Sequence, residues 1–139
     1  MKVFKWIAPY DEKGHSNFKT AMNRAGVYII KENGEIVYVG FSGKNLYRTL
    51  HRHFENWTHQ LQEVVTYKSK MQRNKYSVRV IYCTAKQAAA LEKKLILKYH
   101  PRDNSQLYEA YITDVATAPE KNYMDSVFGL YNESEAVPF

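Results

Sequence analysis

The 139-residue sequence lacks the features that would hold a protein in a membrane or cross-link it through disulfides. No apolar run approaches the ~20 residues that a membrane-spanning helix needs. The first ten residues, MKVFKWIAPY, alternate charged and bulky side chains and contain no signal-peptide stretch. The lone Cys83 excludes an intramolecular disulfide and a zinc site made of several cysteines. We therefore expect a protein of the reducing cytoplasm with no membrane partner.

Acidic side chains are scarce in the first three quarters of the chain. Residues 1–104 contain 19 Lys and Arg against 8 Asp and Glu, whereas residues 105–139 contain one Lys against six acids. The net charge is +6 and the isoelectric point is near 9.3. A basic body favours polyanions, with nucleic acid as the first candidate, although many small basic proteins bind none. We expect the acidic segment 105–139 to fold over the basic body and limit nonspecific binding.

The hydrophobic pattern predicts one α+β domain, since the chain is long enough for one core and too short for two. Strands are predicted at 3–8, in a hairpin at 26–40, and at 76–83; helices are predicted at 16–24, 46–57 and 84–100. The last of these helices begins with a capping box formed by Thr84 and Gln87 and ends before Pro101. Residues 102–139 show a less regular pattern. We expect a small, mainly antiparallel three-stranded sheet flanked by helices, with N- and C-terminal additions.

The hairpin GVYIIKENGEIVYVG, residues 26–40, contains a tyrosine in each strand, and its turn decides whether the two share a face. A two-residue turn at Asn33-Gly34 would pair Glu32 with Glu35 and place Tyr28 and Tyr38 on opposite faces. It would also set two like charges across from each other, which is unfavourable.

A three-residue loop, 32–34, with Gly34 in a bulge is the alternative. It would pair Lys31 with Glu35 and make Tyr28 and Tyr38 direct neighbours. The opposite face would then be purely apolar, formed by Val27, Ile29, Val37 and Val39. We favour this loop, because a shift by one residue would lose both the charge pairing and the apolar face.

Glu92 occupies an unusual position for a carboxylate. Helical spacing places it beside apolar residues of the predicted helix 84–100, namely Ala88, Ala89, Leu95, Ile96 and Tyr99. A carboxylate withdrawn from water there needs a partner, a proton or a metal ion. A glutamate that reaches solvent at the edge of the stripe, or that pairs with an arginine, is the simpler interpretation.

Arg48 and Arg52 lie one turn apart in the predicted helix 46–57, opposite its apolar stripe. That stripe consists of Leu46, Leu50, Phe54 and Trp57. Like charges at this spacing repel mildly unless an anion such as phosphate lies between them.

In chain order, these motifs are GVY (26–28), YVG (38–40), Arg48 and Glu92 within ALEKKLILKYHPRDN (90–104). This set resembles the GIY-YIG nuclease family over about residues 25–104, which leaves 1–24 as an N-terminal extension and 105–139 as an acidic C-terminal one. The separation of Arg48 from YVG, the helical Glu92 and a final Pro-x-x-Asn ending in Asn104 make the resemblance specific.

The resemblance implies a metal-dependent endonuclease that hydrolyses phosphodiester bonds in DNA, with RNA left open. Tyr28 and Tyr38 would position or deprotonate the attacking water, and Arg48 would bind the scissile phosphate. Glu92 would hold one divalent cation, Mg²⁺ or Mn²⁺, and Asn104 would tie down the end of the helix. A catalytically silent nucleic-acid-binding module on the same scaffold is the alternative.

The sequence departs from the family at the position four residues after Arg48, where many members carry histidine and this chain has Arg52. His53 joins the apolar side of the predicted helix, so we expect no site role for it. The candidate phosphate contacts are Lys44, His51, Arg52, Lys68, Lys70, Arg73 and Lys75. Specificity is expected to come from the N-terminal segment, the basic loop, a homodimer or a partner.

Overall fold

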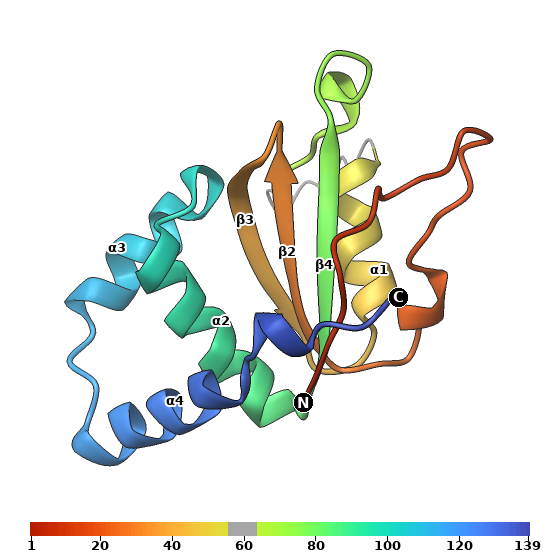
Figure 1. Ribbon diagram of the computed structural model, residues 1–139. Coiled ribbons are helices and arrows are strands. Elements are labelled where there is room, and N and C mark those ends of the chain that lie inside the picture. Colours follow the sequence, from red (N-terminus) through yellow and green to blue (C-terminus); the bar gives the residue numbers. More distant parts are fainter. Residues whose placement is uncertain (56–63) are drawn as a thin grey trace.

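The computed structural model describes residues 1–55 and 64–139 and contains a four-stranded antiparallel sheet with helices on both faces (Figure 1). The strands are β1 (Lys2–Val3), β2 (Gly26–Glu32), β3 (Glu35–Ser42) and β4 (Tyr76–Tyr82), and their order is β1-β4-β2-β3. The α+β prediction is confirmed. The sheet has four strands instead of three, because two residues at the N-terminus pair with β4. The rest of the expected strand 3–8 makes only isolated bridges.

The helices are α1 (Leu46–His51), α2 (Ala85–Tyr99), α3 (Ser105–Thr113) and α4 (Ala118–Leu130). α2 begins with the predicted capping box, and it ends where His100 adopts the left-handed conformation, with φ at 44°. α1 lies on one face of the sheet, and α2 lies on the other with α3 and α4 around it (Figure 1). None of the helices in the described part of the chain is long and apolar enough to span a membrane.

Three sequence predictions about helices are wrong in extent. The helix expected at 16–24 is only a 3₁₀ turn, Lys19–Ala21. The helix expected at 46–57 changes at His51 to a 3₁₀ turn, Arg52–Phe54, and its predicted end with Trp57 lies outside the described residues. The segment 102–139, expected to be irregular, contains α3 and α4, because their aromatic side chains can pack against α2.

The hairpin combines features of both predicted turns. Asn33 and Gly34 both have positive φ, 51° and 85°, as a two-residue type I′ turn requires, and Glu32 pairs with Glu35. The favoured three-residue loop is therefore wrong, as is the direct pairing of the tyrosines. A register shift after Ile30 inserts one extra residue into β3, so that Tyr38 lies opposite Ile30 and Gly40 opposite Tyr28.

Because of this bulge, Tyr28 and Tyr38 lie on the same face of the sheet although they are not paired directly. Tyr28 and Tyr38 both belong to the core layer against α1. Val37 joins that layer too, contrary to the expectation that it would lie with Val27 and Ile29 on the opposite face. The like charges of Glu32 and Glu35 are tolerated because Arg102 binds the Glu32 carboxylate at 2.8 Å and lowers its pKa to about 2.

The acidic extension is attached to α2 by ion pairs. Lys93 binds Asp114 at 3.0 Å and Glu120 at 3.1 Å, and Lys94 binds Asp125. These carboxylates lie at the end of α3 and on α4. The extension therefore covers the basic side of α2 and neutralises part of it.

Candidate active site

Tyr28 and Tyr38 lie side by side in the candidate site. Their rings stack with centroids 6.1 Å apart, and Tyr28 is 1% exposed. The Tyr28 hydroxyl lies over the backbone of Gly40 in the edge strand β3, where a Cβ atom would be only 2.3 Å from it. The final glycine of YVG is therefore required because it makes room for the phenol of GVY. Gly26 is required for a similar reason, since its Cβ would lie 1.9 Å from the carbonyl oxygen of Ile81.

His53 is a site residue that sequence reasoning set aside. It is 3% exposed, and its Nδ1 lies 2.7 Å from the carbonyl oxygen of Val65. A carbonyl can only accept, so Nδ1 carries the proton and Nε2 accepts from the Tyr28 hydroxyl at 2.7 Å. Burial lowers the pKa of His53 to about 4, so the ring is neutral at physiological pH. The sequence places His53 correctly on the apolar side of its helix; the error was to assume that the site lay elsewhere.

Glu92 is buried, with 4% of its surface exposed. Burial raises the pKa of its carboxyl group to about 7, while a hydrogen bond from Tyr111 and the charge of Lys93 oppose the rise. Burial also raises the pKa values of Tyr28 and Tyr38, and the negative charge of Glu92 raises both further. The helix on one face of the sheet thus brings its carboxylate into the electrostatic range of the tyrosine pair on the other.

The partner of Glu92 is Tyr111 from α3, whose hydroxyl donates to Oε1 at 2.6 Å. Within residues 1–55 and 64–139, Oε2 has no hydrogen-bond partner. A buried carboxylate with one satisfied and one open oxygen fits a hard divalent cation, which prefers oxygen ligands. A metal cluster of three or more His, Cys, Asp or Glu side chains is absent from the same residues, so any cation here would complete its shell with water and phosphate oxygens.

Arg48 differs from this cluster in its exposure to solvent. It is exposed on α1, and no hydrogen bond or ion pair links its side chain to the other described residues. Its backbone N–H is bound by the helix cap, Asn45, at 3.1 Å. Lys44, just before the helix, is also exposed. Both cations are therefore available to a ligand from solvent, in contrast to the buried tyrosines and Glu92.

Asn104 joins the segment after α2 to the sheet edge. Its Oδ1 accepts from the N–H of Val39 at 2.7 Å, and its Nδ2 donates to the carbonyl of Val39 at 3.1 Å. Tyr38 is the neighbour of Val39 in β3, so this pair of bonds fixes the backbone at the site. Asn104 thus fastens the residues following the helix, as expected, and does so by binding the edge strand.

The predicted phosphate contacts divide into two groups. Lys68, Arg73 and Lys75 are exposed in the loop before β4, and Lys70 is half-buried there. This loop borders the site, since the rings of Tyr67 and His53 are 6.4 Å apart.

The second group lies around α1. His51 is engaged within the fold, with Nδ1 2.8 Å from the Tyr10 hydroxyl and Nε2 3.1 Å from Glu55. Arg52 is half-buried, and its charge helps to keep the neighbouring His53 neutral. The exposed lysines and Arg73 are better placed for an incoming phosphate than His51.

Comparison with known proteins gives one match. A family model described as the GIY-YIG catalytic domain matches residues 24–107, more than half of the chain. Comparison with curated proteins and with solved structures gives no match. The matched range includes Tyr28, Tyr38, Arg48 and Glu92, and it ends before Tyr111.

Proposed function

This chain belongs to the GIY-YIG family, whose members are endonucleases that act on nucleic acids, and from that premise we propose that it is a metal-dependent endonuclease hydrolysing phosphodiester bonds in DNA. The observation that carries the proposal is a buried carboxylate, Glu92, whose charge acts on the stacked pair of Tyr28 and Tyr38. Burying a carboxylate beside two phenols raises the pKa of all three groups. A scaffold without a reaction to perform would gain stability by losing that carboxylate.

Glu92 would hold the cation through Oε2, because Oε1 is already bound by Tyr111. A bound Mg²⁺ or Mn²⁺ would stabilise negative charge on the oxygens of the scissile phosphate. The ionised form of Glu92 is the one that binds a cation, so cation binding and proton loss from the carboxyl group would occur together.

Tyr28 and His53 would handle the proton of the attacking water. Because burial raises its pKa, Tyr28 stays a neutral phenol at physiological pH, and a neutral phenol is a poor base by itself. The Tyr28 oxygen can accept a proton from water if its own proton moves at the same time to Nε2 of His53, which already accepts that hydrogen bond. Tyr38, which stacks on Tyr28 and is tilted against His53 with centroids 4.4 Å apart, would close the other side of the water site.

Arg48 would bind the scissile phosphate from the solvent side. An exposed guanidinium with no partner among the described residues breaks no such contact when it binds an anion, and its planar donor group matches two phosphate oxygens. Lys44 would add a second cation near the helix start. The exposed cations of the loop before β4 would contact the nucleic-acid backbone farther from the cut and would add affinity without sequence preference.

The test uses labelled single-stranded, duplex and branched DNA, and RNA, with Mg²⁺ or Mn²⁺. We expect cation-dependent cleavage that is lost in Glu92→Gln and in Arg48→Ala. Glu109→Gln, which changes an exposed carboxylate on α3, is the matched control and should cleave normally. Absence of cleavage of every substrate with either ion would refute the proposal.

The catalytically silent binding module makes the opposite prediction for Glu92. Its DNA affinity would fall with salt as phosphate contacts require, and Glu92→Gln would bind with the salt slope of the wild-type protein. The presence of Tyr28, Tyr38, Arg48 and Glu92 in one chain favours the enzyme.

A further inference from the structure

Tyr111 lies on α3, beyond the residues that the family model matches, yet it makes the only direct hydrogen bond to the Glu92 carboxylate within the described chain. We propose that Tyr111 is a positioning residue: it orients Glu92 for cation binding and so makes the C-terminal extension part of the active site. This inference rests on the proposed function, because Tyr111 acts only through Glu92.

The hydrogen bond selects which carboxylate oxygen remains free. Tyr111 donates to Oε1 at 2.6 Å, a short distance typical of a donor bound to a carboxylate. Rotation of the carboxylate would break this bond, so the bond fixes the orientation of the group and leaves Oε2 for a cation. Side chains that hydrogen-bond a metal ligand commonly set its orientation in this way, and their loss weakens metal binding.

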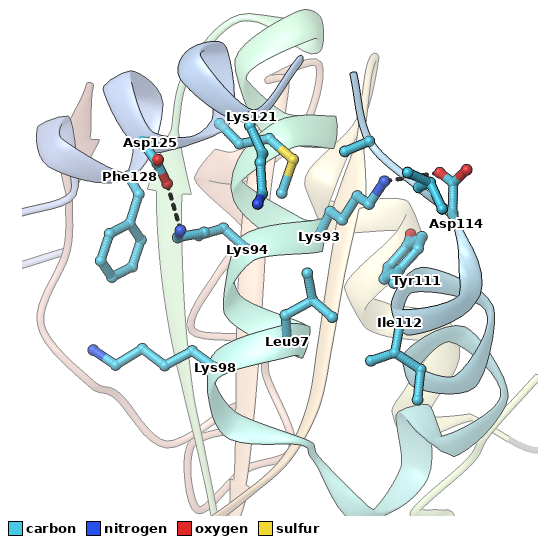
Figure 2. A pocket seen from close by; sticks show the side chains of 13 residues that line it. Lys93, Lys94, Leu97, Lys98, Tyr111, Ile112, Asp114, Lys121, Asp125 and Phe128 are labelled. Atoms are coloured by element: carbon cyan, nitrogen blue, oxygen red, sulfur yellow. Dashed lines mark hydrogen bonds and ion pairs between the residues drawn. The ribbon is translucent and has the colours of Figure 1, made fainter. Parts of the chain in front are cut away.

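The ring of Tyr111 has a cationic neighbour as well. The ammonium group of Lys93, the residue after Glu92, lies 5.3 Å from the centroid of the Tyr111 ring. Lys93 is in turn bound by Asp114, which follows α3 (Figure 2), and by Glu120 of α4. Two consecutive residues of α2 thus engage one tyrosine, one through its hydroxyl and the other through its ring.

Tyr111 also lines a cavity of about 680 Å³ between α2, α3 and α4, and its side chain is only partly buried (Figure 2). The phenol is therefore not enclosed by the core on every side, as a tyrosine that only filled space would be. Its ring packs against the core beside α2, whereas its hydroxyl binds Glu92, which makes the hydroxyl the informative group to remove.

The experiment compares Tyr111→Phe with Tyr108→Phe, which deletes a hydroxyl from the same helix. Tyr108 stacks on His100 with centroids 3.6 Å apart and has no hydrogen bond to Glu92, so it is a matched control. Mn²⁺ binding is followed in the absence of DNA by the electron paramagnetic resonance signal of the free ion. Cleavage is measured in parallel as a function of Mn²⁺ concentration.

We expect Tyr111→Phe to bind Mn²⁺ about 10- to 100-fold more weakly and to need correspondingly more Mn²⁺ for half-maximal cleavage. The rate at saturating Mn²⁺ should recover to within a few-fold of wild type, and Tyr108→Phe should match wild type throughout. If Tyr111→Phe unfolds, Asp114→Asn, which loosens α3 without touching Glu92, should weaken Mn²⁺ binding in the same direction.

Wild-type Mn²⁺ affinity in Tyr111→Phe, or in the folded Asp114→Asn if the first variant is unfolded, would overturn the inference. An equal loss in Tyr108→Phe would do so too, because the effect would then come from α3 as a whole. A different result refutes the proposed function itself. If the wild-type protein neither cleaves nucleic acid nor binds Mn²⁺, both the proposed function and the role of Tyr111 are wrong.

Discussion

Replacing Glu92 by glutamine should make the metal-free protein more stable while removing its activity. The side chain is buried, and burial raises its pKa from 4.5 to about 7. Glutamine has a similar shape and can still accept the Tyr111 hydrogen bond, but it carries no charge that must be withdrawn from water. The site would thus be a place where stability is given up for function.

The magnitude follows from linkage between protonation and folding. A pKa shift of this size corresponds to about 3 kcal/mol against folding while the carboxyl group is ionised. Because the folded pKa lies above the unfolded one, the folded protein binds the extra proton between about pH 4.5 and pH 7, and stability falls as the pH rises through that window. We expect Glu92→Gln to exceed wild type by about 3 kcal/mol near pH 8 and by about 1 kcal/mol near pH 5.

Urea unfolding of both proteins in buffer with a chelator measures this difference. His53, whose pKa is lowered by burial, also makes stability depend on pH, but it is present in both proteins and cancels. Glu109→Gln, an exposed substitution, should show no such gap at either pH. A Glu92→Gln protein that is no more stable than wild type near pH 8 would refute the reasoning, because burial of the ionised carboxylate would then not lower the free energy of unfolding.

Three further predictions concern the neighbours of the site. Gly40→Ala places a methyl group against the Tyr28 hydroxyl, so we expect a loss of about 1–3 kcal/mol in urea unfolding and a large loss of cleavage. His53→Phe keeps a ring but removes the acceptor for Tyr28, so the cleavage rate at saturating cation should fall about 100-fold or more while DNA affinity is retained. Asn104→Ala leaves the N–H and carbonyl of Val39 without their partner, which should cost about 2 kcal/mol in thermal or urea unfolding.

Each has an outcome that contradicts it. Gly40→Ala with wild-type cleavage would show that the position of the Tyr28 phenol is unimportant. His53→Phe with an unchanged rate would remove histidine from the proton path. Asn104→Ala with wild-type stability would mean that water replaces the side chain at the sheet edge without loss.

Local patterns predicted the parts of the molecule that depend on near neighbours in sequence. The spacing of apolar residues predicted the long helix α2, and the same spacing placed Glu92 on its buried side, where it is found. The capping residues Thr84 and Gln87 fixed its start to within a residue. These features follow from helix geometry alone, which is why one sequence suffices for them.

Features that depend on distant residues were missed or predicted incorrectly. The like-charge pair in the hairpin was rejected because its compensating partner, Arg102, is 70 residues from Glu32 in sequence. His53 was given no role because the residues around it in sequence do not show that the Tyr28 side chain enters the same core layer, on the α1 face of the sheet. Tyr111 could be assigned no role, since its contact with Glu92 requires the chain to reverse direction after α2. The catalytic roles of Tyr28, Tyr38, Arg48 and Glu92 stay predictions.

The two bonds from Asn104 to Val39 also bear on how copies of this chain can associate. An edge strand invites a neighbouring strand to pair with its free backbone groups, and a side chain that uses both groups of one residue imitates such a neighbour. Extension of the sheet across β3 would have to break both bonds beside Tyr38. We therefore expect copies of this chain not to associate by extending the sheet across β3.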